Sequence, residues 1–189
     1  MIKDNEMLAT VKDVADRLND LGINYMVTGS VALGVYVPAR TTFDVDIVVE
    51  MGSTDARRFE KKFMNDYYVD ASSIVRAEKD QSMFNIINNS TMVKVDCIVR
   101  KQDRFEIEKF TRRQRAEIAG VEFWVSGKED LILSKLKWAA DTHSARQFED
   151  IDRLLETGTD DKFLSDNIKK MELQEVWEAF GQWKTQVRK

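Results

Sequence analysis

Cysteine, histidine and proline are scarce in this sequence. It has one cysteine, Cys97, one histidine, His143, and one proline, Pro38. A single cysteine excludes an intramolecular disulfide, and a single histidine without a cysteine partner excludes a zinc site of the usual kind. Low cysteine use is typical of a reducing compartment, so we expect a cytoplasmic location.

Long apolar runs are also missing. No stretch approaches the roughly 18 apolar residues that a membrane-spanning helix needs, and the charged N-terminal segment does not look like a secretory signal. The 29 basic and 33 acidic side chains leave a net charge of −4, which argues against a protein that coats nucleic acid. We expect no membrane partner, and one α/β core with room for a small helical appendage.

The most informative stretch is residues 25–49. A short apolar run ends at Gly29-Ser30, a helix-like segment follows, and a second apolar run contains Asp44 and Asp46. Because side chains alternate along a strand, the two aspartates point the same way. Neighbouring carboxylates repel unless a cation lies between them, and Mg²⁺ (or Mn²⁺) favours such oxygen ligands together with substrate phosphates. Gly29 lets the backbone approach a ligand, and the N–H groups that start the next helix favour phosphate.

A third aspartate lies in a strand-like segment further along the chain. Residues 91–99 alternate, and the polar residues 88–90 predict a turn that closes a hairpin with residues 82–87. In this strand Asp96 shares a face with Lys94 and opposes the apolar side. Taken alone, the pattern also fits an exposed aspartate on an edge strand.

The periodicity of the remaining chain predicts helices and strands up to residue 126 and only helices after it. Residues 67–79 are expected to form a strand edge followed by a helical turn. Ser126 and Glu129 have the spacing of a capping box at the start of the helical part. The expected helices are residues 7–21, 31–36, 54–65, 103–113, 128–141, 146–156, 162–170 and 173–185. The expected strands are residues 23–28, 43–49, 82–87, 91–99 and a hairpin over 115–125.

The order of Gly29-Ser30, a helix-like spacer and the pair Asp44 and Asp46 resembles the DNA polymerase beta-like nucleotidyltransferase superfamily. This resemblance implies an α/β (α+β) fold, with a mixed antiparallel sheet flanked by helices and followed by a C-terminal helical bundle. It also implies a catalytic domain over residues 1–126 and a helical region over residues 127–189 that packs on it.

The same resemblance implies a reaction and its site residues. The reaction is metal-dependent transfer of an NMP from an NTP to a hydroxyl acceptor, with release of pyrophosphate. Asp44, Asp46 and Asp96 would be the metal ligands, and Asp96 would also act as the general base or orient the attacking hydroxyl.

The resemblance further implies how the nucleotide is held. Gly29 and Ser30 would cradle the triphosphate. In this superfamily the residues just ahead of the first aspartate often touch the nucleotide, and Arg40 and Thr42 occupy those positions here.

The helical end carries a second resemblance. Residues 129–155 look like the C-terminal motifs of abortive-infection and toxin-type nucleotidyltransferases, in which Lys135 and Asp150 match the lysine and the acidic position. This implies that Lys135 offsets the charge of the triphosphate and that Asp150 orients this lysine or an attacking group. The second acidic position of that motif is Arg153 here.

The acceptor stays open at this point. A tRNA end or a protein hydroxyl fits the toxin-like resemblance, and a small alcohol fits the similar-sized antibiotic-modifying nucleotidyltransferases. A non-catalytic nucleotide-binding antitoxin or regulatory module of the same fold is the alternative from another class, and the three aspartates argue against it. A homodimer, or a complex with a cognate partner protein, is also left open.

Overall fold

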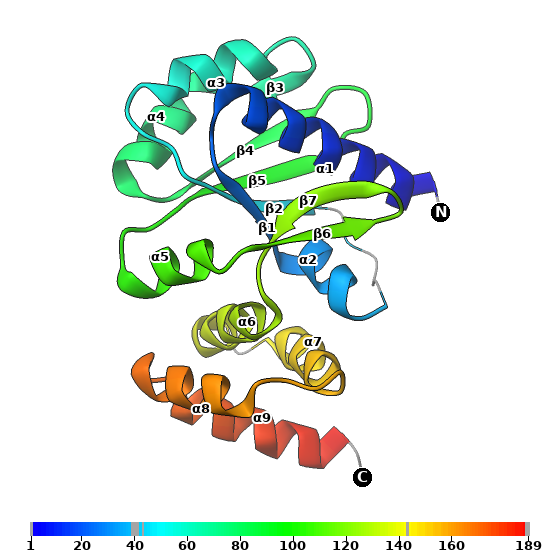
Figure 1. Cartoon of the computed structure of the whole chain (residues 1–189), viewed down its shortest axis with the longest axis vertical. Coiled ribbons are helices and arrows are strands. Elements are labelled where there is room, and N and C mark those ends of the chain that lie inside the picture. Colours follow the sequence, from blue (N-terminus) through cyan, green and yellow to red (C-terminus); the bar gives the residue numbers. More distant parts are fainter. Residues whose placement is uncertain (1, 39–41, 43, 143, 188–189) are drawn as a thin grey trace. The chain divides into compact units, whose positions relative to one another are not determined.

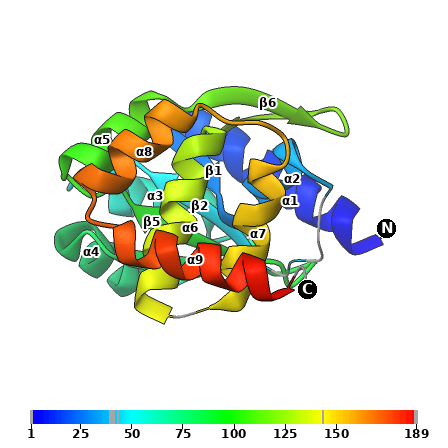
Figure 2. The same cartoon turned by 90° about the horizontal axis from the view of Figure 1, so that it is seen from below.

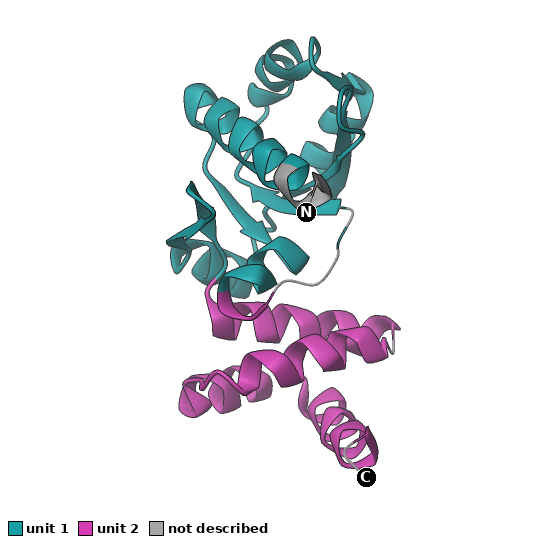
Figure 3. Cartoon of the chain, turned by 90° about the vertical axis from the view of Figure 1, so that its right-hand side faces the viewer, with its two compact units in different colours: residues 1–35, 39–126 teal, residues 36–38, 127–189 magenta. Residues whose placement is uncertain are grey.

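The computed structural model describes residues 2–38, 42, 44–142 and 144–187. The chain divides into two units (Figure 3). Unit 1 contains residues 1–35 and 39–126, and unit 2 contains residues 36–38 and 127–189. No described helix is long and apolar enough to cross a membrane.

A mixed seven-stranded sheet forms the centre of unit 1, in the order β3-β4-β5-β2-β1-β7-β6. The pairs β1–β7 and β2–β5 are parallel, and the other neighbours are antiparallel. This sheet with its flanking helices confirms the predicted fold class. The strands are β1 (Tyr25–Thr28), β2 (Asp44–Val49), β3 (Tyr67–Val69), β4 (Met83–Asn88), β5 (Lys94–Val99), β6 (Gln114–Ile118) and β7 (Val121–Val125).

Helices lie on both sides of the sheet (Figure 1). Helices α1 (Ile2–Leu21), α3 (Asp55–Phe63) and α4 (Ala71–Asp80) are on one side, and α2 (Gly29–Tyr36) and α5 (Arg104–Thr111) are on the other. The side chains of β2 and β5 that face the first layer are all buried, and they are Val45, Ile47, Val49, Val95, Cys97 and Val99. Burial raises the pKa of the Cys97 thiol, so this side chain packs as a small apolar group.

The opposite face of the sheet is apolar only in part. Met26 of β1 and Val48 of β2 pack with Phe110 of α5, and Ile98 of β5 lies against them. Asp46 and Asp96 lie on the same face, two residues before Val48 in β2 and two residues before Ile98 in β5. The pleat therefore gives this face an apolar part under α5 and a polar part beyond it.

Unit 2 consists of helices in the described part of the chain (Figure 2). These are α6 (Lys128–Thr142), α7 (Ala145–Leu155), α8 (Asp161–Lys170) and α9 (Gln174–Val187), close to the predicted ranges. The ring of Phe148 lies 5.7 Å from that of Phe180 and 5.8 Å from that of Trp183, so the aromatic stripe of α9 packs on α7 as core.

Some local predictions need correction. The chain after β3 forms the ten-residue helix α4 instead of one turn, and Asp70 caps it by accepting a hydrogen bond from the N–H of Ser72. At α3, Thr54 is the N-cap residue, but its side chain makes no capping hydrogen bond. At α6, the carbonyl of Gly127 accepts from the N–H of Leu131, and the carboxylate of Glu129 accepts from the N–H of Asp160 at 3.1 Å. The capping box of Ser126 and Glu129 stays a prediction.

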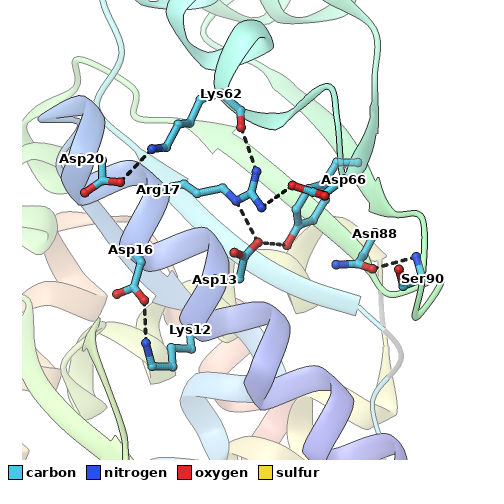
Figure 4. A network of polar contacts seen from close by, with 10 residues as sticks. Lys12, Asp13, Asp16, Arg17, Asp20, Lys62, Asp66, Asn88 and Ser90 are labelled. Carbon is cyan, nitrogen blue, oxygen red and sulfur yellow. Dashed lines mark hydrogen bonds and ion pairs between the residues drawn. The ribbon is translucent and has the colours of Figure 1, made fainter.

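A polar network joins α1 to the segment between α3 and β3 (Figure 4). Arg17 donates from Nε to Asp13 at 2.9 Å, from one terminal nitrogen to Asp66 at 2.6 Å, and from the other to the carbonyl of Lys62 at 2.8 Å. The hydroxyl of Tyr67 donates to the same carboxylate of Asp13 at 2.7 Å. The Arg17 side chain is only 18% exposed, so this guanidinium binds the N-terminal helix to the edge of the sheet.

Substituting Arg17 should therefore destabilise unit 1. Arg17→Leu removes the arginine donor from Asp66 and from the carbonyl of Lys62, and it leaves Asp13 with the hydroxyl of Tyr67 alone, so we expect the free energy of unfolding to fall by about 2 kcal/mol. Lys12→Leu is the matched control, because Lys12 also pairs with an aspartate four residues on but both side chains are 59% exposed. Urea denaturation should show no change for Lys12→Leu. Equal losses for the two variants would contradict the role of Arg17.

Candidate active site

The three predicted metal ligands, Asp44, Asp46 and Asp96, lie on two neighbouring parallel strands. Asp46 of β2 is the register partner of Asp96 of β5, and Asp44 is the partner of Lys94. Paired positions of adjacent strands present their side chains on the same face. The structure thus places Asp44, Asp46, Lys94 and Asp96 together as a two-by-two array, which we call the aspartate face.

The surroundings of the aspartate face follow from the same sheet register. Thr28, the last residue of β1, is the partner of Asp46, and Asn85 of β4 is the partner of Asp96. Asp44 and Asp46 are half-buried, and Asp96 is buried, with 7% of its surface exposed. The face is thus polar at this level of four central strands, although the opposite side of β2 and β5 is apolar.

Helix α2 starts directly beside Asp46. Gly29, its first residue, has a positive φ of +62°, and a Cβ atom at this position would lie 2.0 Å from Oδ2 of Asp46. Both the backbone conformation and the space require glycine here. The carboxylate of Asp46 therefore occupies the place of a side chain at position 29, and Ser30 follows in the first turn of α2.

Asp96 is half satisfied by a lysine that sequence reasoning placed on its face but to which it gave no role. The ammonium of Lys94 donates to Oδ2 of Asp96 at 2.9 Å. Oδ1 of Asp96 is buried and has no hydrogen-bond partner among the described residues. A buried carboxylate oxygen without a partner is unfavourable in a folded protein, so it marks a place where a donor or a cation would stabilise the structure.

The charge of the aspartate face also acts on Lys94. Its hydrogen bond to Asp96 raises the pKa of Lys94, partial burial opposes this, and the charges of Asp96, Asp44 and Asp46 raise it further. Lys94 therefore stays protonated at neutral pH and lies in the negative field of all three aspartates. The alternation in Lys94-Val95-Asp96 was the sequence signal that could have revealed this pairing.

The residue types fit a divalent ion, but the ligands are not preassembled. Among the described residues, no group of three or more histidine, cysteine, aspartate or glutamate side chains is arranged to hold a metal ion. Asp46 lies against Gly29, and Asp96 is bound to Lys94. Three carboxylates on one face, one with an unpartnered buried oxygen, match the hard oxygen ligands that Mg²⁺ prefers.

Of the two residues before Asp44 that are predicted to touch the nucleotide, the structure describes only Thr42. The hydroxyl of Thr42 donates to the backbone carbonyl of Asp44 at 3.3 Å, so Thr42 lies beside the start of β2. Arg40 lies outside the described residues.

Lys135 and Asp150 lie together in unit 2, as the second resemblance implied. The ammonium of Lys135 on α6 donates to Asp150 on α7 at 2.7 Å, and Oε1 of Gln147 is 3.4 Å from the same nitrogen. The lysine side chain is 6% exposed and the aspartate side chain 1%. Breaking such a buried pair is strongly destabilising, so it links α6 to α7 whatever else it does.

Several solved structures share this fold at low sequence identity. A candidate nucleotidyltransferase from Thermotoga maritima matches with a TM-score of 0.53 and 17% identity, over 74% of this chain and 88% of its own. ANT(2")-Ia in complex with adenylyl-2"-tobramycin matches with a TM-score of 0.55 and 10% identity, over 96% of this chain and 99% of its own. An antigenic nucleotidyltransferase-like protein from Paracoccidioides brasiliensis matches with a TM-score of 0.55 and 17% identity, over 91% and 92%.

No protein-family model and no curated protein sequence matches the chain. At 10 to 17% identity the structural likeness establishes the fold, and this fold is the one found in nucleotidyltransferases.

Proposed function

We propose that this protein is a metal-dependent nucleotidyltransferase, which moves an NMP from an NTP to a hydroxyl acceptor and releases pyrophosphate. The observation that carries the proposal is the in-register placement of Asp44, Asp46 and Asp96 on one face of β2 and β5. The shared fold with nucleotidyltransferases supports it. In such a reaction most of the catalysis comes from positioning and from neutralising phosphate charge, which a few carboxylates can organise.

In this proposal the start of α2 holds the triphosphate. Gly29 keeps the backbone free of a side chain, and the N–H groups of the first turn, including that of Ser30, favour phosphate oxygens. Asp44, Asp46 and Asp96 would hold the divalent ion, which when bound neutralises phosphate charge and polarises the α-phosphate. Thr42, through its hydrogen bond to the Asp44 carbonyl, steadies the start of the strand that carries two of these ligands.

Asp96 takes the proton in the proposed reaction. The acceptor hydroxyl gives its proton to the Asp96 carboxylate, and the oxygen forms a bond to the α-phosphorus. The bond from the α-phosphorus to the bridging oxygen breaks, and its electron pair leaves with pyrophosphate. The geometry of Asp96 supports this assignment, because its Oδ1 has no hydrogen-bond partner among the described residues and can accept a hydrogen bond from a hydroxyl.

The buried pair of unit 2 has no step in this scheme. The roles implied for Lys135 on the triphosphate and for Asp150 as its orienting partner stay predictions. Their 2.7 Å contact supports the orienting part alone.

For the acceptor we favour a small alcohol. ANT(2")-Ia, which matches this fold over almost its whole length, is known in complex with an adenylylated antibiotic, and this supports the choice. Incubation with labelled NTPs, followed by mass spectrometry of aminoglycosides, tRNA and protein, tests it. Label on tRNA or protein would replace the small alcohol as acceptor, and no label on anything would favour the non-catalytic antitoxin or regulatory module.

The metal ligands lead to the first prediction for this site. Asp46→Asn should weaken Mg²⁺-dependent NTP binding by about tenfold or more, because a neutral amide is a poor ligand for a hard cation. Isothermal titration with and without EDTA measures this, and circular dichroism checks the fold. Glu117→Gln, an exposed carboxylate on β6 of the same sheet, is the matched control and should bind as the wild type does. Metal-independent NTP binding that Asp46→Asn leaves unchanged would refute the metal site.

The proposed role of Asp96 leads to a second prediction for this site. A group that prepares the attacking hydroxyl stabilises the transition state more than bound NTP. Asp96→Asn should therefore weaken Mg²⁺-dependent NTP binding no more than Asp46→Asn does, but it should reduce turnover by about a hundredfold or more. Pyrophosphate release measures turnover. Loss of metal binding in this variant would make Asp96 chiefly a metal ligand, and unchanged turnover would remove it from the chemistry.

A further inference from the structure

Lys94 lies on the aspartate face together with the three proposed metal ligands. It is the register partner of Asp44, it lies two residues before Asp96 on the same strand, and its ammonium is 2.9 Å from Oδ2 of Asp96. Like charges placed opposite each other on neighbouring strands destabilise a sheet. Asp46 and Asp96 are such a pair. Lys94 thus supplies a positive charge where this face of the sheet concentrates negative ones.

The lysine neutralises Asp96 incompletely. Its single ammonium reaches one oxygen, and Oδ1 of the same buried carboxylate has no partner in the described part of the chain. A divalent ion carries twice the charge and binds several oxygens at once. It should therefore replace the ammonium at this carboxylate, because two cations close to one oxygen repel each other.

The exposure of Lys94 makes such a replacement feasible. Its side chain is 37% exposed, so the ammonium can move into water once the ion neutralises the buried carboxylate of Asp96. The lysine–aspartate pair that joins α6 to α7, Lys135 with Asp150, shows the contrast. There the two side chains are 6% and 1% exposed, and the lysine has no comparable access to water.

We propose that Lys94 is the resting counter-cation of the aspartate face. Its ammonium neutralises Asp96 before the divalent ion binds, and it moves toward solvent when the ion takes its place. The inference rests on the proposed function, since it requires the aspartates to be metal ligands. It explains why the three carboxylates share one face although they are not gathered as a ready metal site.

If Lys94 is the counter-cation, it has opposite effects on the stability of the metal-free fold and on metal binding. Without metal, Lys94 stabilises the fold, because it offsets the repulsion between the carboxylates. With metal, Lys94 opposes binding, because the ion must displace it. A lysine that instead binds the phosphates of the substrate would favour binding of the metal–nucleotide complex and would not compete with the ion.

The test uses the full chain and Mn²⁺ alone, without nucleotide. Lys94→Met keeps the length of the side chain and removes the charge, Lys94→Arg keeps the charge, and Lys101→Met is the control at an exposed lysine just beyond β5. Mn²⁺ affinity is measured by electron paramagnetic resonance, and the thermal midpoint is measured in EDTA and in Mn²⁺. We expect Lys94→Met to bind Mn²⁺ about tenfold more tightly than the wild type, as for the removal of one neighbouring positive charge.

In EDTA, the midpoint of Lys94→Met should fall by several degrees, and Mn²⁺ should raise it by more than in the wild type. Lys94→Arg and Lys101→Met should match the wild type in EDTA. The double variant Lys94→Met/Asp96→Asn removes both charges and should regain the wild-type midpoint in EDTA. A double variant as unstable as Lys94→Met would show that the lysine acts through something other than Asp96 and would contradict the inference.

The outcomes separate this inference from the proposed function. Wild-type Mn²⁺ binding that is lost in Asp46→Asn but unchanged or weakened in Lys94→Met overturns the counter-cation role and leaves the metal site standing. Absence of Mn²⁺ binding in the wild type and in Lys94→Met overturns both. Binding that appears only in Lys94→Met supports the inference most strongly, because the lysine alone then blocks the site.

Discussion

Repulsion between carboxylates on β2 and β5 is the constraint on which the rest of the site depends. Asp46 and Asp96 are register partners, and Asp44 lies two residues from one of them. Such a pairing persists only if the sheet cannot slip. A shift of the strand register by one residue would turn the aspartates toward the side covered by α1, α3 and α4. The valines of the same strands would then point to the polar face. Burial of the apolar side of β2 and β5 thus fixes the register and keeps the aspartates close together although they repel each other.

Gly29 extends this constraint to the neighbouring helix. The carboxylate of Asp46 fills the space beside it, so the beginning of α2 and the second aspartate adjoin. A larger residue at position 29 would collide with Asp46 and would also be strained at a φ of +62°. In the proposed function, the start of α2 holds the phosphates and Asp46 holds the metal. The contact between Gly29 and Asp46 therefore fixes the position of both relative to each other.

Two of the lysine–aspartate pairs show how burial changes what the same kind of contact does. Lys135 with Asp150 and Lys94 with Asp96 have similar lengths, 2.7 and 2.9 Å. The first pair is sealed between two helices and acts as a fixed link, because separating buried charges is strongly unfavourable. The second has a lysine with ready access to water, and it can exchange its partner for another cation. Distance alone would not have distinguished them.

Local patterns in the sequence determined much of this protein. Alternation predicted the strands that carry Asp44, Asp46 and Asp96 and the hairpin of β4 and β5, and helical periodicity predicted α1 and the four helices of unit 2. These features depend on neighbours within a few residues, which the sequence displays directly. The extent of α4 escaped it, because a helix that short depends on packing against β4 and β5 more than on its own periodicity.

Only the tertiary structure decided how the elements combine into a site. The alternation of each strand says which way its side chains point, but it does not say which strand lies next to which. The parallel pairing of β2 with β5, across an intervening segment of more than 40 residues, sets Asp46 opposite Asp96 and Asp44 opposite Lys94. The sequence showed Lys94 and Asp96 on one face. In the folded chain they form an ion pair, and Oδ1 of Asp96 has no hydrogen-bond partner among the described residues. Contacts between distant segments depend on the whole packed core, and no local pattern encodes them.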